Sequence, residues 1–247
     1  MNMRSKYVIF GSALVLVSAV IHLIHYLIFH DMHHISIYLI GRIAFVPIEV
    51  LLASLIIHHF LERIENKHKM EKLNMIIGSF FSEVGNDLLA VISDADPHLD
   101  HVREKFVIKD VWSEKEFADF EVFLKGYIYK VDMNKIDLVP FASSIISKRN
   151  YLVSLLQNPV MFEHESFTEL LRAVFHLTEE LEYRGDLSSL PNSDRLHLSG
   201  DVKRVYSLLS RDWLKYMQYQ KANYPYLFSL AMRTNPFDKD ASVVVTE

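Results

Sequence analysis

Two long runs of apolar residues occupy the first quarter of the chain and form its strongest pattern. The first covers residues 7–29 and is interrupted only by His22 and His25. The second covers residues 35–61 and carries a few residues that break the run: Arg42, Pro47, Glu49, His58 and His59. About 20 apolar residues in a helix cross the hydrocarbon core of a bilayer. Because backbone amides in hydrocarbon must be hydrogen-bonded within their own segment, we predict two transmembrane helices.

A five-residue connector, residues 30–34, joins the two apolar runs. It is too short to cross the membrane, so the two helices should form an antiparallel hairpin. The competing interpretation is a cleaved signal peptide, because residues 1–6 are basic. However, the first run exceeds the ~7–15 apolar residues usual in a signal peptide, and a second apolar run follows it. We therefore predict a retained hairpin.

The remainder of the chain shows the spacing of amphipathic helices. Apolar residues recur at steps of three and four through residues 73–91, so the second helix should continue beyond the membrane. Further helices are predicted from the Ser113–Glu116 capping box to about residue 127, then at 139–156, 165–183, 202–220 and 225–232. Residues 184–195 read as a loop. The prediction is an all-α fold with a transmembrane hairpin at 1–61, a helical domain at 62–240 and a flexible tail at 241–247.

Charge marks the same boundary as hydropathy. Asp, Glu, Lys and Arg are sparse before residue 62 and frequent after it, where acidic residues outnumber basic ones. Nucleic-acid binding requires clustered basic residues, so this acidic excess argues against nucleic acid as a partner. The chain has no cysteine, which excludes disulfides, thiolate metal sites and cysteine nucleophiles.

Basic residues lie before the first helix of the hairpin and after the second, but not in the connector. Arg4 and Lys6 precede the first helix, and four basic residues follow the second: Arg63, Lys67, Lys69 and Lys72. Lys and Arg accumulate on the cytoplasmic side of membrane helices. We therefore predict a multi-pass protein of the cell membrane with both termini in the cytoplasm and the histidine-rich connector outside.

Four segments carry a resemblance to known proteins: residues 45–51, 80–85, 164–176 and 224–237. They resemble segments of a family of hypothetical prokaryotic membrane proteins with two transmembrane helices. The resemblance covers nearly the whole chain. Because no activity is known for that family, the resemblance implies no activity and offers no functional residues.

Glu49 is the first candidate for chemistry, because it falls near the middle of the second predicted span. An ionised carboxylate there costs about 2.5 kcal/mol or more. Two interpretations stay open: a proton or ion relay or subunit contact, and a protonated side chain making one structural hydrogen bond. Arg42 lies seven residues earlier on roughly the same face. We expect it to extend toward the outer surface rather than pair with Glu49.

Histidines form the second group of candidates, near the outer end of the hairpin. His22 and His25 share one helix face, and His30, His33 and His34 have the H-x-x-H-H spacing found in membrane di-iron desaturases and hydroxylases. Imidazoles at this spacing can ligate zinc, iron or copper. Those enzymes need about eight histidines facing the cytoplasm, whereas this cluster should face outward. We predict no cofactor, with a histidine-bound transition metal as the alternative.

Polar residues of the helical domain are predicted to be structural. His176 shares a helix face with Arg172 and Glu180, which favours a solvated, salt-bridged surface. A di-metal carboxylate bundle needs a Glu-x-x-His motif from each of two helices, and the chain has this spacing only once, at Glu65 and His68. The acidic and histidine-rich stretch at 94–104 reads as a solvated turn that caps the next helix.

The chain lacks nucleotide-binding glycine loops, a Gly-x-Ser-x-Gly motif and a His-Glu-x-x-His motif, so it gives no support for an enzyme. We predict a membrane protein that forms homo-oligomers in the lipid bilayer. Its helical domain would sense a signal or bind a cytosolic protein. One alternative is an ion- or proton-conducting oligomer that uses Glu49 and His22. Another is a membrane metalloenzyme at the cluster of His30, His33 and His34.

Overall fold

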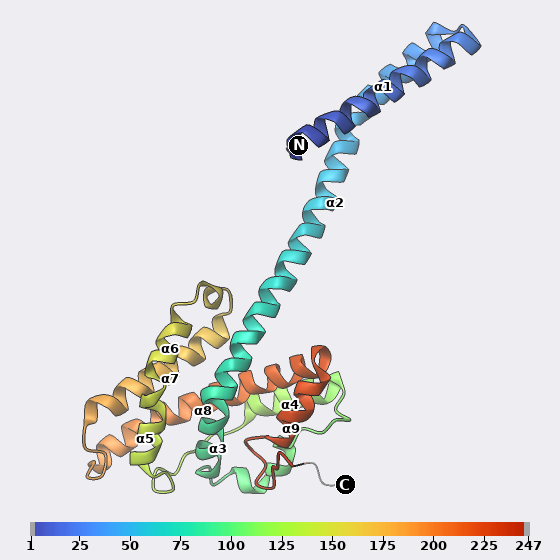
Figure 1. Cartoon of the computed structure of the whole chain (residues 1–247). Coiled ribbons are helices and arrows are strands. Elements are labelled where there is room, and N and C mark those ends of the chain that lie inside the picture. Colours follow the sequence, from blue (N-terminus) through green and yellow to red (C-terminus); the bar gives the residue numbers. More distant parts are fainter. Residues whose placement is uncertain (1–2, 245–247) are drawn as a thin grey trace. The chain divides into compact units, whose positions relative to one another are not determined.

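The computed structural model describes the backbone of residues 3–244 and the side chains of residues 10–161 and 164–244. Within that range every regular element is helical (Figure 1), which confirms the predicted all-α class. The elements are α1 (Met3–Phe29), α2 (Met32–Phe80), the π-helical turn η1 (Phe81–Gly85), α3 (Asn86–Asp94), the short 3-10 turns η2 (Leu99–His101) and η3 (Arg103–Phe106), α4 (Glu114–Gly126), α5 (Leu138–Ser147), α6 (Arg149–Leu156), the 3-10 turn η4 (Pro159–Glu163), α7 (Glu165–Arg184), α8 (Asn192–Asn223) and α9 (Pro225–Arg233).

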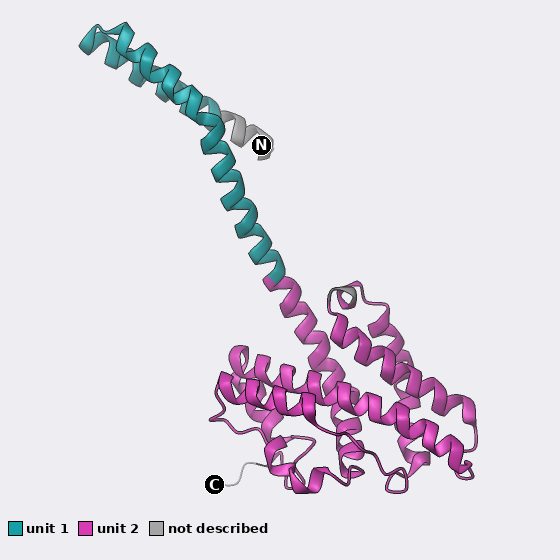
Figure 2. Ribbon diagram, turned by 180° about the vertical axis from the view of Figure 1, so that it is seen from behind, with its two compact units in different colours: residues 1–66 teal, residues 67–247 magenta. Residues whose placement is uncertain are grey.

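The chain divides into two compact units, residues 1–66 and residues 67–247 (Figure 2). The first unit holds α1 and the first part of α2. Both helices are long and apolar enough to cross a membrane, and none of the residues in their most apolar windows is buried within the chain. The first unit therefore leaves its apolar side chains without cover of its own.

The turn between α1 and α2 is shorter than predicted. Only His30 and Asp31 separate the helices, and His30 adopts a left-handed backbone with φ +48°. The Asp31 carboxylate accepts the backbone N–H of His34 at 2.9 Å, which caps the start of α2. Helix α2 consequently begins at Met32, three residues before the predicted start of the second helix.

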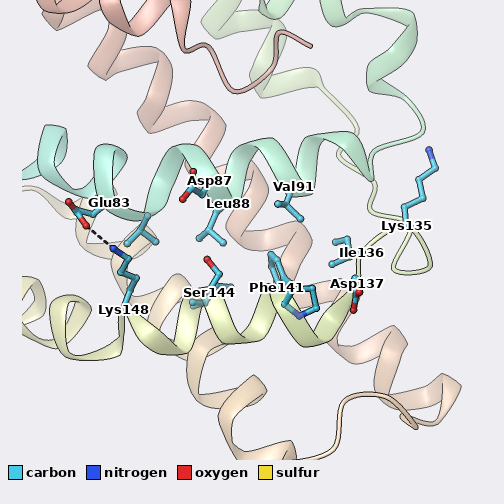
Figure 3. A pocket seen from close by; sticks show the side chains of 13 residues that line it. Glu83, Asp87, Leu88, Val91, Lys135, Ile136, Asp137, Phe141, Ser144 and Lys148 are labelled. Carbon is cyan, nitrogen blue, oxygen red and sulfur yellow. Dashed lines mark hydrogen bonds and ion pairs between the residues drawn. The ribbon is translucent and has the colours of Figure 1, made fainter. Parts of the chain in front are cut away.

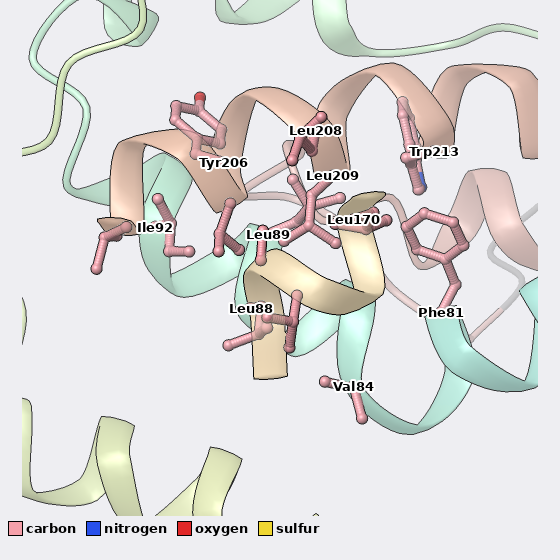
Figure 4. Packing of buried hydrophobic residues seen from close by; sticks show 14 of the residues in the cluster. Phe81, Val84, Leu88, Leu89, Ile92, Leu170, Tyr206, Leu208, Leu209 and Trp213 are labelled. Carbon is pink, nitrogen blue, oxygen red and sulfur yellow. The ribbon is translucent and has the colours of Figure 1, made fainter. Parts of the chain in front are cut away.

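The second unit is built on the packed pair α7 and α8. Helices α3, α4 and α9 pack on α8, and α5 and α6 pack on α7. One buried apolar cluster (Figure 4) contains Leu170 of α7, Leu209 and Trp213 of α8, and Phe81 and Leu89. The apolar stripe predicted for 165–183 is buried along its whole length, and Gly185, with φ +66°, ends the helix as expected.

Helix boundaries in the second unit also differ from prediction. The helix predicted through residue 91 is interrupted by the π-turn η1, and the single helix predicted at 139–156 is two helices that part at Lys148. The predicted loop 184–195 is shorter, because α8 begins at Asn192. Part of the predicted tail, residues 245–247, lies outside the described residues.

The start of α8 has a visible cause in a side chain of the preceding helix. Arg184 donates to both carboxylate oxygens of Asp194, at 2.6 and 2.9 Å. This bidentate pair spans the turn between α7 and α8 and fixes the first turn of α8. The contact is tertiary, so helix periodicity alone does not reveal it.

Candidate functional site

Arg42 and Glu49 form an ion pair on the surface of α2. Arg42 Nη1 lies 3.5 Å from Glu49 Oε1, and Arg42 Nε donates to the Tyr38 hydroxyl at 3.2 Å. The guanidinium carbon also lies 5.5 Å from the centre of the Tyr38 ring. The side chains of Arg42 and Glu49 are 60% and 58% exposed, so the pair is available to a second molecule.

This pairing corrects the expectation that Arg42 would extend away from Glu49. The two residues are almost two helical turns apart, and the contact forms because both long side chains reach toward each other along one face. Pairing neutralises the charge of each residue on an otherwise apolar stretch of α2. The site therefore resembles a neutralised polar patch on an apolar helix.

A second feature of the first unit is a cavity of about 310 Å³ between α1 and α2. It is lined by six residues: Ile21, His22, His25, His34, Ile35 and Tyr38. The His25 and His34 rings stack with their centres 6.3 Å apart. His25 Nδ1 is buried and makes no hydrogen bond to the described residues, whereas His22 Nδ1 is hydrogen-bonded to the Ser18 carbonyl at 2.9 Å.

The predicted metal triad of His30, His33 and His34 is not assembled in the structure. His34 faces His25 rather than its sequence neighbours, and the His30 ring lies 6.0 Å from the Tyr26 ring. Among the described side chains, one group of three possible metal ligands has its ligand atoms within 4.8 Å of one another. This group is Glu180, His197 and Asp201, in the second unit. The hairpin thus brings together His25 and His34, a pair that sequence spacing does not favour.

The second unit carries a groove that sequence reasoning missed (Figure 3). Its volume is about 290 Å³, and it lies between the η1–α3 segment and α5. Val84, Leu88 and Phe141 contribute apolar lining, and Glu83 and Lys148 close one end with an ion pair of 2.7 Å. The hydrogen bond to Glu83 raises the pKa of Lys148. The lining residues come from 83–91 and 135–148, so only the packed fold places them together.

The groove combines an apolar floor with a charged rim. Asp87, Lys135 and Asp137 join the rim, so charges of both signs surround an apolar floor. Such a surface fits a partner that offers an apolar side chain with flanking polar groups.

The stretch predicted as a solvated turn, residues 94–104, contains a buried carboxylate. Asp96 is 1% exposed and accepts the Tyr127 hydroxyl at 2.8 Å and the His98 N–H at 2.9 Å. Burial raises the pKa of Tyr127, and the hydrogen bond from its hydroxyl to Asp96 raises it further. Asp96 is therefore part of the packed structure and not of a solvated turn, because its two donors satisfy the carboxylate inside the core.

Comparison with known proteins gives matches over both units. Residues 2–61 match the description "MJ1433, N-terminal helical domain", and residues 69–233 match "Uncharacterized protein MJ1433, C-terminal helical domain". The chain is 44% identical over 247 residues to "Uncharacterized protein MJ1433" of Methanocaldococcus jannaschii, covering all of this chain and 99% of that relative. No solved structure gives a significant match.

Proposed function

We propose that this chain, which belongs to the MJ1433 family of helical proteins, is a membrane-anchored binding protein. The hairpin α1–α2 would span the bilayer, and the second unit would stand in the cytoplasm. The observation that carries this proposal is the contrast between the units. The second buries an extended apolar core, whereas the apolar windows of the first are 0% buried.

The exposed apolar helices need cover, and lipid supplies it best. The core helix of a soluble protein would be covered by its own chain, and these helices are not. The family match covers both apolar helices together, residues 2–61, as one helical domain, which supports a hairpin that acts as a unit. The basic residues at both outer ends of the hairpin support cytoplasmic termini.

The exposed Arg42–Glu49 pair supports a further part of the proposal, namely homo-oligomers. An ion pair that faces lipid is costly, and a second copy of α2 would cover it with polar groups of its own. In membranes, Arg42→Gln and Glu49→Gln should reduce chemical cross-linking between copies. The apolar replacement Leu52→Ile on the same helix is the matched control and should leave cross-linking unchanged. Equal cross-linking in all variants would contradict this part.

The groove between α3 and α5 is the proposed partner site. Its apolar floor and mixed-charge rim match a cytosolic protein segment with an apolar side chain between charged ones. Phe141 contributes to that floor and is itself buried, so polar changes at the rim, such as Lys135→Glu, are the milder probe of binding.

Truncation tests the anchor. The full chain should sediment with membranes and resist carbonate extraction, whereas residues 67–247 expressed alone should remain in the supernatant with a helical circular dichroism spectrum. The reason is that the second unit holds the buried core and the first holds the uncovered apolar surface. Release of the full chain by carbonate would contradict a membrane-spanning hairpin.

A second candidate function, proton or ion conduction by an oligomer, is favoured by the charged pair on α2 and by the unpartnered His25 Nδ1. Two helices cannot enclose a pore, so conduction requires assembly. Liposomes carrying the protein should then show a flux that Glu49→Gln abolishes. Liposomes without flux would remove this candidate while leaving the anchor proposal intact.

A further inference from the structure

Four possible metal ligands meet between the facing sides of α7 and α8 in the second unit. His176 and Glu180 lie one helical turn apart on α7, and His197 and Asp201 lie one turn apart on α8. Residues four apart share a helix face, so each helix presents one imidazole and one carboxylate to the other. The packed pair α7–α8 brings these two faces together.

Each imidazole lies close to both carboxylates. His176 Nε2 is 3.8 Å from Glu180 Oε1 and 3.9 Å from Asp201 Oδ1. His197 Nε2 is 3.7 Å from Glu180 Oε2 and 3.6 Å from Asp201 Oδ2. Each imidazole therefore faces one oxygen of each carboxylate, and two of the four contacts cross from one helix to the other.

We propose that His176, Glu180, His197 and Asp201 form a binding site for one divalent transition-metal ion of the zinc class. Zinc takes four nitrogen, oxygen or sulfur ligands at about 2.0–2.2 Å, and in a tetrahedron such bonds put the ligand atoms about 3.4 Å apart. Ligand atoms of Glu180, His197 and Asp201 lie within 4.8 Å of one another, and the two His197 contacts, 3.7 and 3.6 Å, are already close to the tetrahedral separation. His176 contacts the other oxygen of each carboxylate, so it would move toward the ion to become the fourth ligand. Two imidazoles and two carboxylates suit zinc, and not calcium or magnesium, which prefer oxygen alone.

An ordinary ion-pair network accounts for this geometry less well. Hydrogen bonds from a protonated imidazole to a carboxylate close to about 2.7–2.9 Å, and all four separations here are longer. Asp201 Oδ2 is buried and has no hydrogen-bond partner among the described residues. A buried carboxylate oxygen without a donor is unusual in a packed protein, and a role as metal ligand explains it.

Charge around the cluster also favours a dication. Arg184 forms hydrogen bonds with Glu180 and with Asp194. The positive charge of Arg184 offsets the negative charge of Asp194, so the carboxylates of Glu180 and Asp201 leave the cluster with a net charge of −2. Arg184 is a positioning residue, because it orients a ligand and does not reach the ion itself.

The site is open on one side. The side chains of His176 and His197 are 52% and 59% exposed, whereas Glu180 and Asp201 are mostly buried. An ion would enter past the imidazoles without opening the core. Because it would bridge α7 to the first turns of α8, bound metal would stabilise the start of α8. This inference concerns the second unit alone, so it holds whether or not the hairpin spans a membrane.

Metal titration of the purified full chain tests the proposal. After removal of metals with a chelator, calorimetry with Zn²⁺ should detect one site that His197→Ala weakens at least 10-fold. Co²⁺ in place of zinc should give the visible absorption of a tetrahedral complex. At 100 times the dissociation constant, zinc should raise the melting temperature of the full chain by roughly 5–10 °C, a rise that the variant lacks.

Controls separate this site from the other histidines of the chain. His101→Ala replaces an exposed histidine of the same unit and should leave zinc binding unchanged, as should the hairpin variant His25→Ala/His34→Ala. Asp201→Asn keeps the shape of its side chain and decides the matter if His197→Ala does not fold. Zinc binding that is absent, or equal in the wild type and in Asp201→Asn, would overturn the proposal.

Discussion

Asp212 shows how a single buried carboxylate makes the fold sensitive to pH. It lies on α8 with its side chain 6% exposed, accepts the Ser166 hydroxyl at 3.1 Å and faces Lys215 at 3.5 Å. Burial raises the pKa of Asp212, against smaller opposing effects of Lys215, Ser166 and His164. Folding therefore favours the protonated form, so this carboxyl costs stability once the pH rises above its unfolded pKa of about 4.

The sign of this effect gives a prediction for Asp212→Asn. Below about pH 4 the wild type and the variant should be similarly stable, and as the pH rises toward 7 the variant should become the more stable of the two. The asparagine keeps an oxygen that can accept from Ser166 and has no charge to desolvate. Urea unfolding at several pH values measures the difference, with Asp119→Asn as the exposed control. A difference that does not grow with pH would contradict the account.

Individual candidate residues could be found from the sequence more easily than their partners. Glu49 and Arg42 stand out because a charge is rare in an apolar run, and the structure adds only that they touch. The cluster around His176 could not be predicted, because His197 and Asp201 lie just after the predicted loop 184–195 and outside the predicted helices. The available signal was two matching motifs, His-x-x-x-Glu and His-x-x-x-Asp, on segments that pack together.

At the scale of elements, the π-turn η1 is the feature that periodicity missed. Its five residues, Phe81–Gly85, join α2 to α3 with a wider turn than an α-helix, which rotates the faces of the two helices relative to each other. A Cβ atom on Gly85 would lie 2.5 Å from Cδ1 of the Phe81 ring and 3.1 Å from the Phe80 ring. The glycine is required because both rings are buried in the core and cannot move away.

Gly85→Ala should therefore destabilise the second unit by about 1–3 kcal/mol, the usual cost of overpacking a core. Gly200→Ala provides a matched control, because this glycine lies inside α8 with no atom within 4 Å of an added Cβ. Alanine there should stabilise by up to about 1 kcal/mol through helix propensity. Thermal or urea unfolding of the two variants measures both effects, and a neutral Gly85→Ala would contradict the close packing of η1.

Element types could be predicted where local pattern and tertiary packing agree. The apolar stripe of α7 is a local signal that identifies the helix and its buried face. The capping box before α4 and the glycine after α7 are local signals that mark real boundaries. Boundaries set by distant contacts could not be predicted. The break at Lys148 coincides with its ion pair to Glu83, and the start of α8 depends on Arg184 reaching Asp194.

At the scale of the whole molecule, the chain joins two units with opposite surfaces. In the first unit, none of the residues in the most apolar windows is buried within the chain. The second unit packs its aromatic and aliphatic side chains into one core. Composition alone predicts this division, because the change in charge near residue 62 is sharp. The proposed groove and metal site both belong to the second unit, so each can be tested without reference to the membrane.

Site-directed labelling of single cysteines tests the central claim, a membrane hairpin with both termini in the cytoplasm, most directly. The natural chain has no cysteine, so Met32→Cys at the start of α2 and Ser242→Cys near the C-terminus each create a unique thiol at an exposed position. A membrane-impermeant maleimide should label Met32→Cys in intact cells and Ser242→Cys only after permeabilisation. Labelling of Met32→Cys that also requires permeabilisation would contradict the predicted topology and place the histidines of the hairpin turn in the cytoplasm.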